Sequence, residues 1–273
     1  MPIQQFFDVL NIQNNNKEAD MIQSLMGSDC LGAYIKNGIV KLYFQDGLKN
    51  KVETRLMGIK TNSPFEWKWE KQNKEDWHLT WQENFQPVIF DEKLAVIPCW
   101  HDDSSADIVI KIKPGMAFGT GHHATTWLML SQMIKYIKPG ISVLDLGSGS
   151  GILSIAALKL GAEKIDAIEN DPNCIINFSE NLKLNNIAKG IQYYSENALN
   201  WNNLDYDLIL ANINRDVIEK LIPNLHNSKG TIILSGLLDT DYETLEQLCK
   251  KNNLQIKEKM IKEEWACIII LAH

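Results

Sequence analysis

The chain has 273 residues, of which 45% are hydrophobic and 22% charged, and its formal net charge is −7. This length suits one large domain or two unequal ones, and no run of 18 consecutive apolar residues predicts a transmembrane helix. The first residues lack the basic and then apolar pattern of a secretory signal, so we expect a cytoplasmic protein without membrane partners. Five well-separated cysteines without a CxxC pair indicate neither a disulfide framework nor a zinc site.

The negative charge is unevenly distributed along the chain. Residues 1–85 hold 10 basic and 11 acidic residues, whereas the remainder holds 17 and 23. Since affinity for nucleic acid comes from Lys and Arg that neutralise phosphates, we expect no direct nucleic-acid binding. An acidic surface instead suits a basic partner.

The first 73 residues predict a small ferredoxin-like α+β domain. Alternating apolar and charged residues and the turn signal Asp46-Gly47 indicate strands with half-buried faces. The expected elements, in the order βαββαβ, are strand 3–10, helix 17–26, strands 30–36 and 38–45, helix 48–58 and strand 65–71.

A linker helix is expected at residues 74–86. Trp77, Trp81 and Phe85 are spaced four apart, which places them on one face of a helix. Such a helix either connects two domains as a stiff linker or packs on one of them.

Residues 87–273 predict a catalytic domain with a doubly wound, mostly parallel seven-stranded sheet. From about residue 140 strands and helices alternate with short loops, which favours parallel strand pairing. The last two strands are too close for a helical crossover and so form a hairpin. The expected strands are 142–146, 165–169, 191–195, 208–211, 231–235, 254–261 and 265–271; the expected helices are 127–134, 152–160, 172–184, 216–225 and 242–251.

A glycine-rich turn between the first of these strands and its helix is the strongest motif. It runs from Asp145 through Gly147, Gly149 and Gly151. Glycines allow a ligand to approach the backbone, and a helix N-terminus offers free N–H groups. A dinucleotide site needs glycine where Ile152 stands, and no Lys-Ser/Thr follows for a phosphate loop. The remaining pattern, D-x-G-x-G-x-G, is that of S-adenosylmethionine-dependent methyltransferases, in which Asp145 would hold the loop or meet the ligand's ammonium through water.

Two further side chains at strand ends fit a nucleoside site. Glu169 ends the second strand, where a carboxylate can accept hydrogen bonds from a ribose diol. Asn212 ends the fourth strand and would contact the cofactor or orient an incoming amine; the alternative is an asparagine that satisfies a turn.

An upstream loop, residues 114–126, supplies a second cluster of backbone donors. Phe118, Gly119 and Thr120 lie in it, and Thr126 begins the following helix. Such a loop would cover the methionine end of the cofactor. The adjacent histidines at 122 and 123 have no matching ligand spacing, so we expect no metal.

These motifs together resemble the PrmA family, lysine methyltransferases of large-subunit ribosomal protein eleven. The resemblance rests on Ala-Phe-Gly-Thr-Gly-His-His-Ala-Thr-Thr, Leu-Asp-Leu-Gly-Ser-Gly-Ser-Gly-Ile-Leu, Glu-Asn-Asp-Pro, Leu-Ala-Asn-Ile and the late Glu-Glu-Trp, and covers residues 75–273. It implies a class I methyltransferase fold, an N-terminal domain that recognises the substrate, and a flexible connection. It also implies methylation of lysine side chains, with the N-terminal amine as a further candidate.

Matched by position, the resemblance points to Thr126, Gly147, Glu169 and Asn212 as cofactor contacts. Glu169 stands where the family commonly has Asp, and either carboxylate can accept from a diol.

Other functions stay open at this stage. A class I enzyme acting on RNA or on a protein glutamine is the first alternative, although such enzymes usually carry Asn-Pro-Pro-Tyr where this chain has Asn212-Ile213-Asn214-Arg215. A cofactor-binding module without catalysis and a nicotinamide dehydrogenase are the others, and the second is weakened by Ile152.

Overall fold

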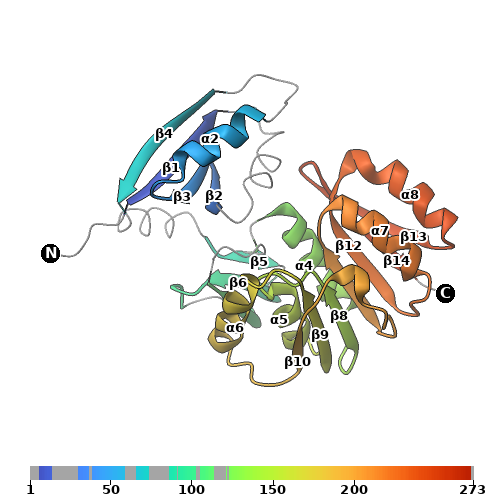
Figure 1. Cartoon of the computed structure of the whole chain (residues 1–273). Helices are drawn as coiled ribbons and strands as arrows, with labels where there is room; N and C mark the ends of the chain where they lie inside the picture. The colour runs from blue at the N-terminus through green and yellow to red at the C-terminus, as the bar shows by residue number, and fades with distance from the viewer. Residues whose placement is uncertain are drawn as a thin grey trace. The chain divides into compact units, whose positions relative to one another are not determined.

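The computed structural model describes residues 6–13, 30–36, 39–58, 66–73, 86–90, 92–102, 105–113, 121 and 123–271 (Figure 1). Contacts divide the chain into two compact units, residues 1–85 and 86–273. Each unit is described by itself. Of the expected linker helix at 74–86, residues 74–85 lie outside the described residues, as does the expected helix at 17–26.

The N-terminal unit is built on a four-stranded antiparallel sheet. Its strands are β1 (Phe6–Gln13), β2 (Cys30–Lys36), β3 (Ile39–Gln45) and β4 (Glu66–Asn73), in the order β2-β3-β1-β4, and α2 (Lys49–Gly58) follows β3. The first strand ends at Gln13, three residues beyond its expected end at residue 10, and its expected first residues, 3–5, lie outside the described residues. The reason for the later end is pairing, because residues 11–13 pair with both β3 and β4.

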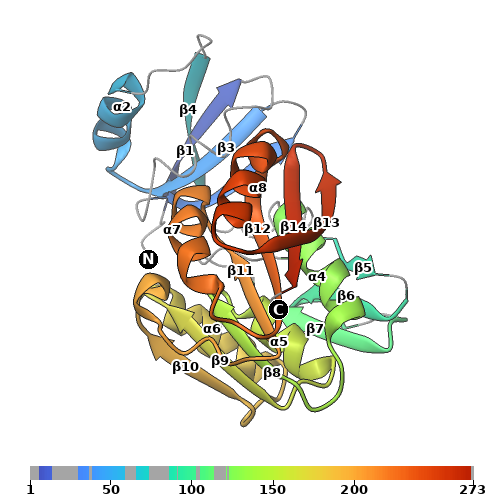
Figure 2. The same cartoon turned by 90° about the vertical axis from the view of Figure 1, so that its right-hand side faces the viewer.

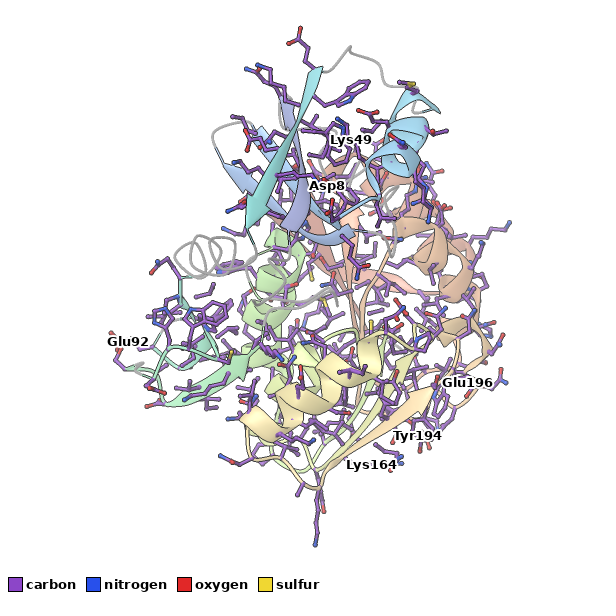
Figure 3. All side chains as sticks on the ribbon, turned by 60° about the vertical axis from the view of Figure 1, so that its left-hand side comes forward. Asp8, Lys49, Glu92, Lys164, Tyr194 and Glu196 are labelled. Carbon is purple, nitrogen blue, oxygen red and sulfur yellow. The ribbon has the colours of Figure 1, made fainter. Side chains whose placement is uncertain are left out.

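One face of this sheet forms the core of the unit with α2. The buried side chains are Leu10, Ile12, Val40, Leu42, Phe44, Val52 and Leu56. The expected turn at Asp46-Gly47 closes β3, with Gly47 at a φ of 93°, which favours glycine. The Gly47 N–H donates to the carboxylate of Asp8 over 3.0 Å, so β1 holds this turn; Asp8 is labelled in Figure 3.

The second unit contains a mixed seven-stranded sheet in the order β10-β9-β8-β11-β12-β14-β13. The strands from β10 to β12 pair in parallel, and β14 is antiparallel to both of its neighbours. The hairpin expected at the C-terminal end is present. The strands are β8 (Ser142–Leu146), β9 (Lys164–Glu169), β10 (Ile191–Ser195), β11 (Leu208–Asn212), β12 (Thr231–Leu238), β13 (Gln255–Lys262) and β14 (Trp265–Leu271).

Helices cover both faces of this sheet. On one face the core includes side chains of α4 (Ala124–Tyr136) and α5 (Ile152–Lys159). On the other face lie α7 (Arg215–Leu225) and α8 (Tyr242–Lys251). Figure 2 shows the strands β11 to β14 between α7 and α4. Along β11 the residues alternate between the two cores, as expected of a strand buried on both faces.

The helix that follows β9 begins later than expected. The sequence predicts a helix from residue 172, but α6 spans Cys174–Leu184. Asp171 explains the difference, because its carboxylate accepts from the Asn173 backbone N–H over 2.9 Å and holds residues 171–173 in a turn. Short 3-10 turns also occur at η2 (Ala198–Asn200) and η3 (Asp239–Asp241).

A separate three-stranded sheet precedes α4 and was not expected from the sequence. It consists of β5 (Val88–Phe90), β6 (Leu94–Pro98) and β7 (Ile108–Ile112), in that order, and β6 pairs in parallel with β7. Its buried residues join the core formed by α4 and α5. In the part of the chain that the structure describes, no helix is long and apolar enough to cross a membrane.

Candidate active site

The glycine-rich turn joins β8 to α5 at the carboxyl edge of the sheet. Gly147, Gly149 and Gly151 have φ values of 76°, 51° and 80°, a region that side chains other than glycine rarely adopt. The N–H groups of Gly147 and Ser148 both donate to the carbonyl of Ile168 at the end of β9, over 2.8 and 3.0 Å. The loop is therefore held against the neighbouring strand.

Ile213 packs directly against the first glycine of this loop. A Cβ at Gly147 would collide with the Ile213 side chain, and a Cβ at Gly236 would collide with the Ile213 carbonyl. The Ile213 N–H donates to the carbonyl of Ser235 over 3.1 Å. Two glycines thus make room for the residue that follows Asn212, and this brings the end of β11 close to the glycine loop.

Glu169 is 9% exposed at the end of β9 and binds the same loop. Its Oε2 accepts from the Gly149 N–H over 3.0 Å, and its Oε1 accepts from the Asp171 N–H over 2.8 Å. Since each carboxylate oxygen has two lone pairs, both can accept a further hydrogen bond. Next to this strand, Glu196 follows the end of β10, whereas Lys164 begins β9 at the opposite edge of the sheet (Figure 3).

Asp145 is completely buried beneath the loop. Its Oδ2 accepts from the Ser154 hydroxyl of α5 over 2.5 Å, and its Oδ1 has no hydrogen-bond partner among the described residues. Burial raises the pKa of this carboxyl to about 7, and the charge of Glu169 adds to the rise while the Ser154 hydrogen bond opposes it. The carboxyl therefore titrates near neutral pH.

Asn212 and Thr126 meet at the same edge. The Asn212 Nδ2 donates to the Thr126 hydroxyl over 3.3 Å, and Thr126 is fully buried in the first turn of α4. The Asn212 Oδ1 is buried and accepts no hydrogen bond from the described part of the chain. A buried acceptor of this kind suits a donor from a bound molecule.

The structure brings Asp145, Gly147, Gly149 and Glu169 together at one edge. Asn212 lies beside them, because Ile213 packs on Gly147, and Thr126 joins them through its hydrogen bond with Asn212. The other three, Phe118, Gly119 and Thr120, lie outside the described residues. Two residues of the site were missed, Ile213 and Ser154. A serine within the apolar helix Ile-Leu-Ser-Ile-Ala-Ala-Leu-Lys is a signal that can identify Ser154.

His123 caps a helix in this structure. Its Nδ1 accepts from the Thr125 N–H over 3.3 Å at the start of α4, and its ring packs edge-on against Trp265 with centroids 4.9 Å apart. The Glu-Glu-Trp motif thus reaches the helix that carries Thr126. No group of three His, Cys, Asp or Glu side chains within the described ranges is placed to hold a metal.

An open hollow of about 650 Å³ lies at the opposite edge of the sheet. Its lining includes Ser142, Asp207, Lys229 and Thr231, at the amino ends of the strands. Ligands of open α/β sheets bind at the carboxyl ends, so this hollow is not the candidate site.

Comparisons with known proteins identify the family. The sequence model of the family described as "Ribosomal protein L11 methyltransferase (PrmA)" matches residues 9–272. A ribosomal protein L11 methyltransferase of Prochlorococcus marinus (strain MIT 9312) is 33% identical over 229 residues, which cover 80% of this chain and 76% of that protein. One of Lactobacillus johnsonii is 39% identical over 202 residues, or 72% of this chain and 64% of the relative.

The chain belongs to the ribosomal protein L11 methyltransferase (PrmA) family.

A solved structure agrees with the fold of this PrmA family member. The crystal structure of ribosomal protein L11 methylase from Lactobacillus delbrueckii subsp. bulgaricus superposes with a TM-score of 0.64 at 32% sequence identity. The match covers 69% of this chain and 100% of the chain in the crystal structure. The seven-stranded mixed sheet is accordingly that of a class I methyltransferase.

The residues of this PrmA site fit S-adenosylmethionine. The glycines allow the left-handed backbone of the turn at the carboxyl edge of the sheet, and the Glu169 oxygens retain lone pairs for a ribose diol. The Asn212 Oδ1 and the Ser148 hydroxyl are buried polar atoms that find no partner in the described part of the chain. Donors and acceptors of a nucleoside and an amino-acid group would satisfy them.

Proposed function

We propose that this protein transfers methyl groups from S-adenosylmethionine to lysine side chains of ribosomal protein L11, with the N-terminal amine as a further target. The single observation that carries the proposal is the buried Asn212 Oδ1 beside the glycine loop, in a chain of this family. Bound S-adenosylmethionine supplies a methyl group on a positively charged sulfur, from which an amine can take it.

The described residues proposed to hold the methyl donor lie at the ends of β8, β9 and β11 and at the start of α4. Glu169 would accept from the ribose hydroxyls, and the backbone of Gly147 and Gly149 would lie against the nucleoside. Thr126 and Asn212 would contact the amino-acid part, together with Phe118, Gly119 and Thr120. Asp145 would hold the loop through Ser154 or meet the ammonium through water.

Asn212 is proposed to position the amine. A lysine amine has an ordinary pKa near 10.4 and must lose a proton before it can attack carbon. A desolvated pocket favours the neutral form, and the Asn212 Oδ1 can accept one of its N–H groups. Alignment of the neutral amine with the sulfonium is then the main source of rate, with effective-molarity gains of up to roughly 7–11 kcal/mol.

We also propose that residues 1–73 form a ferredoxin-like domain that recognises the substrate, that residues 74–86 form the linker helix, and that residues 87–273 form the catalytic domain. The strand order β2-β3-β1-β4, with α2 on one face, supports the first assignment. A ribosomal substrate supports a cytoplasmic location, and the acidic balance of residues 86–273 supports a protein rather than a nucleic-acid partner.

Mass spectrometry of purified ribosomal protein L11 tests this function. L11 is incubated with the enzyme and isotopically labelled S-adenosylmethionine, and peptide mapping locates any gain in mass. We expect labelled methyl groups on lysines. If the protein binds S-adenosylmethionine but adds no mass to L11, the assignment of L11 as the substrate is wrong. Label found on RNA or on a protein glutamine would then identify the methyl acceptor.

A further inference from the structure

The outer edge of β7 is covered by side chains. In the order β5-β6-β7 this strand has a strand partner on one side. The backbone groups that side chains cover belong to residues 109 and 111 and to Lys113, which follows the strand. An edge strand offers unpaired N–H and C=O groups that must be covered or paired. Here helices α5 and α6 provide the cover.

Two asparagines of α6 and a third at its C-terminal cap, spaced four apart, hydrogen-bond this edge in place of a fourth strand. Asn185 binds both backbone groups of Lys111, accepting from N–H over 3.0 Å and donating to the carbonyl over 2.6 Å. Asn181 accepts from the Lys113 N–H over 2.8 Å, and Asn177 donates to the Lys113 carbonyl over 2.9 Å. Because a helix brings residues i, i+4 and i+8 to one face, this series matches a strand edge.

Asn181 differs from the other two because it also binds the glycine loop. Its Nδ2 donates to the carbonyl of Ser150 over 2.9 Å, and the side chain is completely buried. Ser150 lies between Gly149 and Gly151. One amide therefore ties the glycine loop to Lys113, which follows β7 and is the last described residue before position 121.

We infer that Asn181 is a positioning residue of the methyl-transfer site. By holding the Ser150 carbonyl, it keeps the glycine loop in the conformation that receives the methyl donor. This inference rests on the proposed cofactor site at that loop. Asn181 acts through Ser150, so we expect it to affect the affinity for the methyl donor and not the rate of the chemical step.

Asn185 provides a matched control. It caps the C-terminus of the same helix four residues after Asn181 and binds the same edge, and it is almost as buried as Asn181. It reaches the glycine loop only through its hydrogen bond to the Asn181 backbone carbonyl. A role limited to packing α6 on β7 predicts equal effects of the two residues on donor binding.

Three variants of the full chain test the inference: Asn181→Leu, Asn181→Asp and Asn185→Leu. Asn181→Asp keeps an acceptor for the Lys113 N–H but loses the donor to Ser150. The dissociation constant for S-adenosylhomocysteine is measured by calorimetry, folding by urea unfolding, and kcat and KM with saturating L11.

We expect both Asn181 variants to raise the dissociation constant and the donor KM by roughly fivefold to tenfold, with kcat at saturating donor within about twofold. Asn185→Leu should lower the urea midpoint but leave the dissociation constant within about twofold. If Asn181→Leu does not fold, Asn181→Asp decides. Asn181 variants that bind as tightly as the parent protein, or an equal loss in Asn185→Leu, overturn the inference. Failure of the parent protein to bind S-adenosylhomocysteine would instead contradict the proposed function.

Discussion

The side-chain amide of Asn212 donates to the Thr126 hydroxyl over 3.3 Å, although 86 positions separate the two residues. This contact occupies the nitrogen of the amide and leaves Oδ1 as a buried acceptor without a partner in the described part of the chain. Thr126 therefore sets which end of the Asn212 amide is presented to a ligand.

Replacing Thr126 with Val should weaken donor binding. Valine keeps the shape but removes the hydroxyl, so the Asn212 amide loses the contact that orients it. We expect a loss of about 1 kcal/mol in binding, or about fivefold in the dissociation constant for S-adenosylhomocysteine, measured by calorimetry. Thr125→Val is the control, because that hydroxyl contacts His123 instead. Equal affinities of Thr126→Val and the parent protein contradict the role given to Thr126.

Replacing Glu169 with Ala should weaken donor binding more strongly. The change removes the acceptor of two backbone N–H groups and the proposed acceptor of the ribose diol. Hydrogen bonds to charged groups contribute about 1.5–3 kcal/mol each, so the loss of even one to the ribose should raise the dissociation constant by at least about tenfold. Glu169→Asp keeps the carboxylate and should stay within about fivefold. If calorimetry gives the same dissociation constant for Glu169→Ala and the parent protein, Glu169 does not bind the methyl donor.

Replacing Gly147 with Ala should destabilise the fold through two effects. A left-handed backbone costs a residue with a Cβ roughly 1–2 kcal/mol, and the collision with Ile213 adds about 1–3 kcal/mol. Gly140→Ala is a control for the first effect, since its φ is 87° and no atom lies within 4 Å of the added Cβ. Urea unfolding measures both variants.

The collision at Gly147 can be tested separately by a double-mutant cycle. Combining Gly147→Ala with Ile213→Ala should recover part of the lost stability, because the smaller side chain makes room for the new methyl group. No coupling between the two changes would show that the Ile213 contact is not the cause.

Asp145 should make stability fall as pH rises. Burial raises the pKa of its carboxyl from 3.8 to about 7. Between these values the folded protein binds the proton more tightly than the unfolded chain does, so unfolding releases it. This contribution is fully present below about pH 4 and is lost as pH rises to about 7, a total of about 4 kcal/mol.

The variant Asp145→Asn isolates this effect. Its amide stays neutral and can still accept from Ser154. The difference in unfolding free energy between the parent protein and Asp145→Asn, measured without cofactor from pH 4.5 to 7.5, should change in favour of the variant as pH rises. A difference that does not depend on pH contradicts the raised pKa.

Much of the second unit, residues 86–273, could be predicted from local patterns. The glycine spacing after a buried strand indicated the loop at Gly147, and helix α8 begins and ends at the expected residues, 242 and 251. In the N-terminal unit the first strand extends three residues beyond its expected end, because residues 11–13 pair with both β3 and β4. The sheet β5-β6-β7 is not predicted, because its strands have only three to five residues and a short apolar run does not distinguish a strand from another buried segment.

The sequence by itself determined which segments become strands, helices and glycine turns, because those preferences arise from neighbours in the chain. Only the tertiary structure decided which distant residues share a site. Thr126 meets Asn212, Asn181 meets Ser150 and Ile213 packs on Gly147 because β8 pairs with both β9 and β11 and because α6 docks on β7. The periodicity of a segment records which of its faces is buried, but not which other segment covers that face, and that choice depends on the packing of the whole domain.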